Sequence, residues 1–104
     1  MKSNLKIMII AVLVLALLAP AAVASAKTIK FTFDNVTFSD GTQGVIEAST
    51  KQTGSGSVYT VCDYYSTGYL NYLGQYQDAN FFSSDPATVK LFCLNHYADR
   101  TLPK

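Results

Sequence analysis

The chain has 104 residues, of which 49% are hydrophobic and 14% are charged, and its formal net charge is +1. A near-neutral chain has too little positive charge to neutralise a row of phosphates, which disfavours nucleic acid as a partner. The length suits one small domain, whose hydrophobic core alone gives only marginal stability.

The start of the chain has the pattern of a secretory signal peptide. Lys2 and Lys6 precede an apolar run over residues 7–19, and small residues follow as far as Ala26. Positive charge, an apolar stretch and a small-residue site are the features of a cleavable export signal. We expect cleavage after Ala26, with cleavage after Ala24 or retention of the segment as a membrane anchor as the alternatives.

Removal of residues 1–26 would leave one domain of 78 residues, 27–104. Two of the eight basic residues lie in the signal, so six remain against seven acidic residues and the net charge becomes −1. We expect a secreted or periplasmic protein that meets a membrane only transiently, through its signal peptide, and does not bind nucleic acid.

Two cysteines, Cys62 and Cys93, would follow the domain into an oxidising compartment. An even cysteine count in a small exported domain indicates a disulfide, and two cysteines allow one pairing. Redox-active pairs are usually close together as Cys-x-x-Cys, so a structural bond is expected here. A closed loop of about 30 residues stabilises a domain by roughly 3–4 kcal/mol on the chain-entropy model.

The first part of the domain reads as β-structure. Strict alternation over residues 28–33 predicts a half-buried strand, and the apolar positions slip by one residue at Asp34-Asn35, which indicates a bulge. Asp40-Gly41 predicts a two-residue hairpin turn before a returning strand over residues 43–49. After a polar loop at residues 49–57, a strand ending at Cys62 would complete a three-stranded meander.

Beyond Cys62 the apolar spacing changes to three and four residues, which predicts an amphipathic helix over residues 63–77. Its stripe consists of Cys62, Tyr65, Tyr69, Tyr72, Leu73 and Tyr76. Gly68 and Gly74 each destabilise a helix by about 1 kcal/mol relative to alanine, so these two positions favour a break in the helix.

A second helix is predicted from Asp85 to about Asp99. Asp85 suits the N-cap, Pro86 suits the first helical position, and Cys93 falls on the inner stripe. The predicted fold is therefore α+β: an N-terminal antiparallel β-hairpin or three-stranded meander, followed by two helices that form a disulfide-linked antiparallel pair.

His96, the only histidine, has Asp99 three residues further along as its one acidic neighbour on the helix. A catalytic base also needs a nucleophile, so we expect His96 to pack at the core edge rather than to catalyse. No metal or other cofactor is expected, because the disulfide uses both cysteines and His96 with Asp99 supplies too few ligands. Asp34 and Asp40 lie at the expected bend and turn, where aspartate commonly hydrogen bonds the nearby backbone, so no calcium or catalytic site is needed to explain them.

A further motif, Asn35-Val36-Thr37, matches the N-glycosylation sequon, which has meaning only in a eukaryotic secreted protein.

Tyrosine is the residue in excess, with six of the seven tyrosines between positions 59 and 76. Tyrosine combines a large apolar area with a polar tip and is enriched at binding surfaces. One hypothesis is a small aromatic core; the other adds an exposed patch that meets a protein, a glycan or a membrane. The candidate partner-binding residues are Tyr59, Tyr64, Tyr65, Tyr69 and Tyr72.

No diagnostic family motif is present. In outline, a signal peptide with one disulfide tying two helices is similar to periplasmic acid-stress chaperones and to small periplasmic immunity proteins. Cys62, Cys93, the adjacent aromatic segment and residues 92–100 carry this resemblance. It implies a non-enzymatic protein that binds another protein. We expect a protein-binding module of this kind, chaperone-like, immunity-like or inhibitor-like; a self-associating envelope or extracellular protein and a small hydrolase using His96 are the alternatives.

Overall fold

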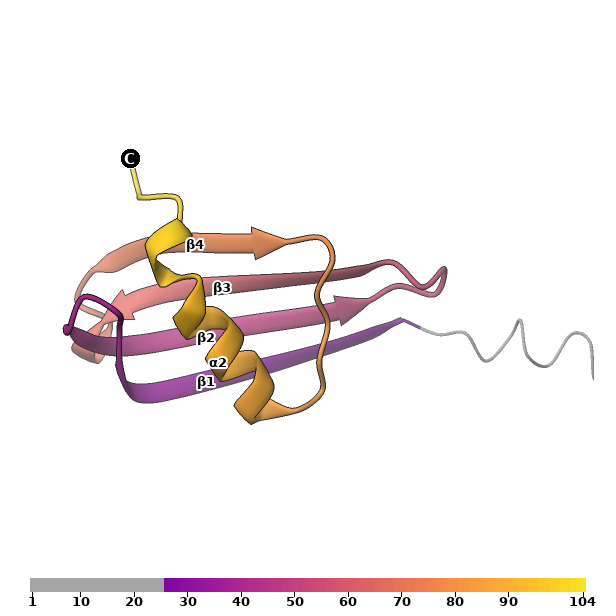
Figure 1. The fold of residues 1–104 in the computed structure, drawn as a ribbon, viewed down its shortest axis with the longest axis horizontal. Helices are drawn as coiled ribbons and strands as arrows, with labels where there is room; N and C mark the ends of the chain where they lie inside the picture. Colours follow the sequence, from indigo (N-terminus) through magenta and orange to yellow (C-terminus); the bar gives the residue numbers. More distant parts are fainter. Residues whose placement is uncertain (1–25) are drawn as a thin grey trace, which may run out of the picture.

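The computed structural model describes residues 26–104, which form a four-stranded antiparallel sheet with a helix across one side (Figure 1). The strands lie in the sheet in chain order, so each one pairs with the next along the chain. They are β1, Lys27–Thr37; β2, Gln43–Gln52; β3, Val58–Ser66; and β4, Tyr72–Asp78. The remaining elements are a short 3₁₀-helix η1, Thr67–Tyr69; the α-helix α2, Pro86–Asn95; and a second 3₁₀-helix η2, Tyr97–Asp99.

The predicted architecture, a hairpin or three-stranded meander followed by two helices, is wrong. Residues 63–77, expected as the first helix, form the end of β3, η1 and β4, and α2 is the one α-helix among residues 26–104. Tyr65 and Tyr72 lie opposite each other on neighbouring strands, so the tyrosine spacing spans two strands and a turn. Gly68 and Gly74 have φ values of +71° and +121°, which a continuous right-handed helix cannot contain.

The first hairpin follows its sequence more closely. The register between β1 and β2 shifts between Phe33 and Val36, where the bulge was expected, and Asn35 has a φ of +55°. The turn is wider than the expected two-residue one. The Gly41 N–H donates to the Phe38 carbonyl at 2.9 Å, and Gly41 adopts a φ of +87°. A glycine at this left-handed position is typical of the longer hairpin loops.

Helix α2 begins where predicted but is shorter. The Asp85 side chain accepts a hydrogen bond from the Thr88 N–H at 3.0 Å, and Pro86 is the first helical residue. The helix ends at Asn95, and η2 follows instead of a continuous helix to Asp99.

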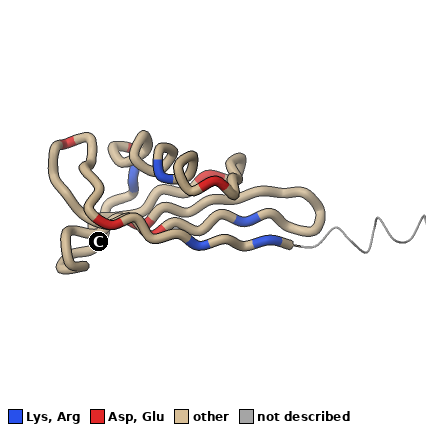
Figure 2. Tube along the Cα trace, turned by 90° about the horizontal axis from the view of Figure 1, so that it is seen from below, with Lys and Arg blue, Asp and Glu red and all other residues tan. Residues whose placement is uncertain are grey.

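The sheet has a helix face, which packs against α2, and an open face on the other side, as the edge-on view in Figure 2 shows. The buried hydrophobic cluster lies between the helix face and the elements that cover it. Its members are Val36, Phe38, Ile46, Ala48, Cys62, Tyr64, Val89, Cys93 and Tyr97. Tyr97 stacks on Phe38 with ring centroids 4.2 Å apart, and Tyr64 packs edge-on against both rings. On the open face Val45, opposite Tyr65, is also buried, with 4% of its surface exposed.

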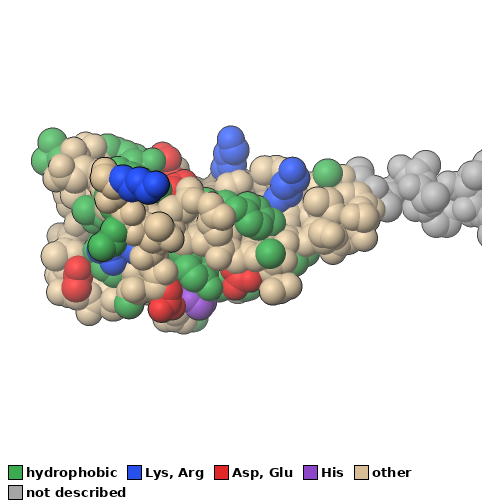
Figure 3. Space-filling model, turned by 90° about the horizontal axis from the view of Figure 1, so that it is seen from above, with side chains coloured by type: hydrophobic (Ala, Val, Ile, Leu, Met, Phe, Trp, Pro, Cys, Tyr) green, Lys and Arg blue, Asp and Glu red, His purple; other side chains and the backbone are tan. Residues whose placement is uncertain are grey.

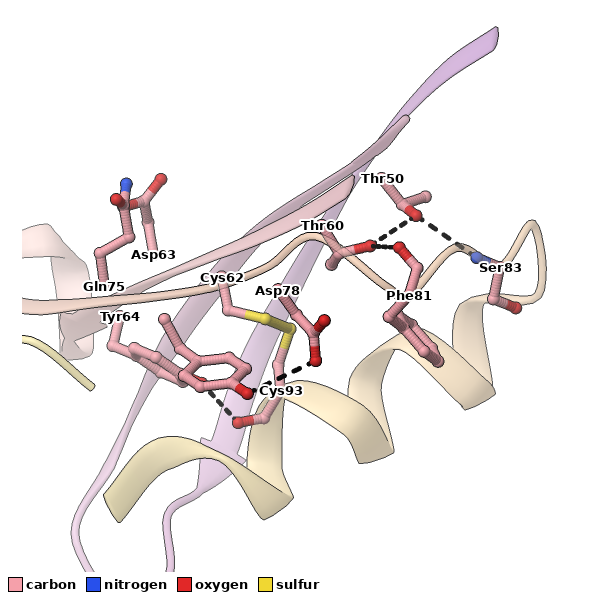
Figure 4. Close-up of a disulfide and its surroundings, with 11 residues drawn as sticks. Thr50, Thr60, Cys62, Asp63, Tyr64, Gln75, Asp78, Phe81, Ser83 and Cys93 are labelled. Carbon is pink, nitrogen blue, oxygen red and sulfur yellow. Dashed lines mark hydrogen bonds between the residues drawn. A yellow bond between two sulfur atoms is a disulfide. The ribbon is translucent and has the colours of Figure 1, made fainter. Parts of the chain in front are cut away.

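Two bonds join α2 to β3 at the same point (Figure 4). Cys62 and Cys93 form a disulfide with their Cα atoms 5.7 Å apart, and both residues are fully buried. The Tyr64 hydroxyl donates a hydrogen bond of 2.6 Å to the Cys93 carbonyl. The predicted disulfide is therefore present, although it links a strand to a helix rather than two helices, and it indicates an oxidising environment.

A buried chain of hydroxyls ties the connection between β4 and α2 to the sheet (Figure 4). The Thr60 hydroxyl donates to the Phe81 carbonyl at 2.7 Å and lies 2.8 Å from the Thr50 hydroxyl. Since a carbonyl only accepts, Thr50 must donate to Thr60, and Thr50 in turn accepts from the Ser83 N–H at 3.3 Å. Each buried hydroxyl thereby both donates and accepts.

The predicted signal peptide falls almost wholly on residues 1–25, which lie outside the described residues. Among residues 26–104, no helix has the length and apolar character needed to span a bilayer.

Loss of the disulfide is expected to lower the free energy of unfolding by about 3–4 kcal/mol, because the unfolded chain loses a constraint on a long loop. The measurement is urea unfolding with and without reductant, and with Cys62→Ala combined with Cys93→Ala. The double variant should be insensitive to reductant, since the chain has no other cysteine. Equal midpoints for the oxidised and reduced native sequence would contradict the prediction.

Acid should weaken the fold partly through Asp85. Hydrogen bonds from the Thr88 hydroxyl and then from its N–H lower the pKa of Asp85 below its usual 3.8. A pKa that is lower in the folded state gives stability that is present above the unfolded value and is lost as pH falls through the folded value. Asp85→Asn keeps a cap without a charge, so its unfolding midpoint should fall less than the native one between about pH 6 and about pH 3.

The matched control for this prediction is Asp34→Asn. It removes the same charge, but Asp34 accepts no side-chain hydrogen bond from any residue of the described chain. An identical acid response in Asp85→Asn and the native protein would show that the cap does not contribute to the pH dependence.

Candidate functional site

The structure separates the five candidate tyrosines into three groups. Tyr64 lies on the helix face and is 0% exposed, so it is part of the core and is not available to a partner. Tyr59 is half-buried near the start of β3, opposite Lys51. It lies about 20 Å along the strand from Tyr65, given the rise per residue of a strand. Only three of the five therefore come together.

Tyr65, Tyr69 and Tyr72 form one group on the open face, which we call the tyrosine cluster. The ring centroid of Tyr65 lies 5.0 Å from that of Tyr69 and 5.3 Å from that of Tyr72. Tyr69 is 45% exposed, Tyr72 is 40% exposed, and the adjacent Leu70 is 82% exposed. The cluster lies at one end of the sheet, and the exposed Leu70 follows it directly in the chain.

Alternation along β3 explains why adjacent tyrosines have different environments. Successive side chains of a strand point to opposite faces, so Tyr64 enters the core while Tyr65 reaches the open face. Tyr65 lies between Val45 on β2 and Tyr72 on β4. The cluster is therefore built across three strands.

A closed turn places Tyr69 over the sheet. The Ser66 N–H donates to the Asn71 carbonyl at 2.9 Å, and the Asn71 N–H donates to the Ser66 hydroxyl at 2.8 Å. Within this turn Gly68 and Tyr69 have φ values of +71° and +60°. The left-handed backbone turns the chain back, so that the Tyr69 ring packs on Tyr65.

Two carboxylates hold the tyrosine hydroxyls. Tyr69 donates to the Glu47 carboxylate at 3.1 Å, and Tyr72 donates to the Asp63 carboxylate at 2.8 Å. Burial, followed by the hydrogen bond to Asp63, raises the pKa of Tyr72 to about 12. The Tyr72 hydroxyl therefore stays protonated at neutral pH and remains a donor. Both rings are oriented before any partner arrives.

A shallow groove of about 410 Å³ continues from the cluster along the open face. The charged residues that line it are Lys30, Glu47 and Asp63. Figure 2 shows both acidic and basic residues on the strands, with the basic ones nearer one end of the sheet. The groove offers mixed polar contacts beside an apolar surface.

His96 occupies a packed position. Its Nδ1 lies 3.1 Å from the Asp99 carboxylate, so the expected acidic neighbour is in place. The imidazole stacks on the Tyr76 ring at 4.2 Å and lies 4.7 Å from the Phe92 ring. No hydroxyl or thiol within residues 26–104 is hydrogen bonded to the imidazole. The contacts account for His96 as a packing residue.

The remaining candidates have local structural roles. Asp40 accepts hydrogen bonds from the Thr42 hydroxyl at 2.6 Å and from the Thr42 N–H at 3.0 Å, which closes the first turn and lowers the pKa of Asp40. Over the described stretch of the chain, no group of three or more potential metal-binding side chains is present. Asn35 is exposed at the bulge, and its glycosylation remains a prediction.

The sequence interpretation missed Leu70 and the two carboxylates of the cluster. Leu70 was assigned to a helix, although the polar Ser66-Thr67-Gly68 segment before it is typical of a turn. Glu47 and Asp63 lie opposite each other on β2 and β3, which only the pairing register reveals.

Comparison of the chain with protein-family models, with curated proteins and with solved structures finds no match. What the site does must therefore be inferred from its own residues.

The environment of Tyr72 can be tested by titration. Asp63→Asn should lower the pKa of Tyr72 from about 12, because it removes the carboxylate that accepts the hydroxyl proton. The value should stay above the usual 10.0, since burial is the larger cause. NMR titration of the tyrosine ring carbons measures it, with Asp85→Asn as a distant control. An unchanged Tyr72 pKa in Asp63→Asn would refute the contact.

Proposed function

We propose that the protein is an exported, non-enzymatic binding module that contacts another protein through the tyrosine cluster and Leu70. The observation that carries the proposal is the exposure of Tyr69 and Tyr72, which both pack on Tyr65, together with the exposure of Leu70, which follows Tyr69 directly. Contiguous apolar surface that the fold leaves in water is characteristic of an interaction site.

Preorganisation supports a binding role. The hydroxyls of Tyr69 and Tyr72 are hydrogen bonded to Glu47 and Asp63, and both rings pack on Tyr65. A partner that covers rings already fixed in place loses less side-chain entropy than one that must order mobile side chains. Tyrosine is accordingly enriched at the centres of protein interfaces.

The surroundings of the cluster favour a protein as the partner. Carboxylates behind two of the rings repel the phosphates of nucleic acids and of anionic lipids. A glycan would stack on the rings, but it would not cover an exposed leucine, which needs an apolar partner. A protein surface can supply apolar groups for Leu70 and hydrogen-bond donors for the neighbouring carboxylates.

The proposed location is the periplasm or the extracellular space. The Cys62–Cys93 disulfide supports an oxidising compartment, and the predicted signal peptide supplies the route to it. A binding role is favoured over hydrolysis because the His96 ring is engaged in stacking and in a contact with Asp99.

Loss of apolar contact area should abolish partner capture. We expect Tyr69→Asn combined with Leu70→Ser to lose a protein that the native form retains from an extract of exported proteins. Asparagine suits the left-handed backbone at position 69, so the turn should be preserved. Quantitative mass spectrometry of cross-linked complexes gives the readout, and circular dichroism checks the fold.

The matched control is Leu91→Ser. Leu91 is 60% exposed on α2, away from the open face, so this variant removes a similar exposed side chain outside the proposed interface. Equal capture by the cluster variant and the native protein would rule out this function. Recovery of further copies of the chain alone would favour a self-associating protein instead.

A further inference from the structure

The outer edge of β4 is only partly occupied by the chain's own backbone. Thr101 pairs with Gln75: the Thr101 N–H donates to the Gln75 carbonyl at 2.7 Å, and the Gln75 N–H donates to the Thr101 carbonyl at 3.0 Å. Arg100 donates from Nε to the Leu73 carbonyl at 2.7 Å. Gly74 permits this approach, because a Cβ there would meet the Thr101 carbonyl oxygen at 2.4 Å. The first half of the edge is therefore covered.

The second half of the edge is open. In a strand, the N–H and C=O groups of alternate residues point to the same side, so the outward groups of Leu73 and Gln75 are followed by those of Gln77. Among residues 26–104, the outward N–H and C=O of Gln77 have no hydrogen-bond partner. Figure 1 shows the end of the chain rising away from β4, with nothing drawn outside the arrowhead half of that strand.

A cleft of about 460 Å³ lies at this open edge, and we call it the edge cleft. The residues that line it include Gln75, Gln77, Tyr72, Leu102 and Pro103. Leu102 is 64% exposed. The cleft thus combines unpaired backbone groups with apolar walls, which is what an added β-strand requires.

The charged side chain that lines the edge cleft is acidic. Asp99 is the one charged residue that lines it, and its side chain is 62% exposed. The nearby Arg100 donates to the carbonyls of Leu73 and Tyr97, and its guanidinium lies 3.9 Å above the Tyr97 ring. Figure 3, which looks onto the β4 side, shows acidic side chains beside the single histidine.

We propose that an extended segment of the partner protein, carrying a lysine or arginine, pairs with Gln77 and lies in the edge cleft. The inference rests on the proposed function, and Tyr72 joins the two surfaces because its ring belongs to both. Backbone hydrogen bonds to Gln77 fix the segment in register, the basic side chain meets Asp99, and apolar side chains contact Tyr72 and Leu102.

The probe is a blocked hexapeptide that alternates valine with lysine, titrated into the isotope-labelled, disulfide-bonded protein. We expect it to shift the Gln77 amide resonance and to slow hydrogen exchange of that amide. A matched peptide with glutamate in place of lysine should bind at least several-fold more weakly. If the lysine peptide leaves the Gln77 amide unchanged, or if both peptides bind equally, the proposal is overturned.

Two variants separate the backbone contribution from the charge. Gln77→Pro removes the outward N–H, a change that an edge strand tolerates, and should abolish the shift. Methylation of the backbone nitrogens of the lysine peptide should do the same with the native protein, which keeps the test valid should Gln77→Pro not fold. Asp99→Asn should weaken binding about two- to fivefold, whereas Asp34→Asn on β1 should not alter it.

Partner capture then distinguishes this proposal from the proposed function. Loss of capture in Tyr69→Asn with Leu70→Ser, but not in Gln77→Pro, would leave the tyrosine cluster as the interface and reject the edge cleft. Loss in both supports both surfaces, and loss in neither rejects both.

Discussion

The bond between Cys62 and Cys93 determines how the rest of the domain is arranged. It joins the middle of β3 to the later part of α2, and the Tyr64 hydroxyl binds the carbonyl of the same Cys93. Cys62 lies opposite Ala48 on β2, whose small side chain leaves room for the helix to approach the sheet. With the helix fixed there, Tyr97 follows into the core and stacks on Phe38. The disulfide therefore holds α2 against one face of the sheet.

Within residues 26–104, the other face of the sheet has no covering layer. A domain of this size contains too few residues to build a second layer, so the open face must be made compatible with water. Along most of it, charged and polar residues such as Lys30, Glu47 and Gln75 achieve this. At one end the surface consists instead of Tyr65, Tyr69 and Tyr72. The hydroxyls of Tyr69 and Tyr72 are hydrogen bonded to carboxylates. The cluster differs from the rest of the face, and it lies beside Val45, which is paired with Tyr65 and is only 4% exposed.

The sequence predicted those elements whose signals are local. The bulge after Phe33 was indicated by apolar positions that shift by one residue along the strand. The start of α2 was indicated by Asp85 and Pro86. The prediction of a helix over residues 63–77 was wrong because tyrosines on two strands and on the turn between them are spaced three and four residues apart, as they would be on a helix. Two-residue alternation from Thr60 through Cys62 to Tyr64 was present as a competing signal, and the β-preference of tyrosine agreed with it.

The candidate site was predictable in composition but not in geometry. Tyrosine excess indicated an aromatic surface, yet the choice between Tyr64 and Tyr65 depends on which face α2 covers, and only the disulfide and register decide that. The two-residue alternation of a strand also decides which backbone groups of β4 face outward. Because the Gln75 backbone faces outward to Thr101, the Gln77 backbone faces outward too, and the edge at Gln77, beyond the part that Thr101 covers, is left able to pair. The exposed rings and the open edge thus arise from one alternation pattern, which places an apolar contact surface and a set of backbone hydrogen-bonding groups within reach of a single partner.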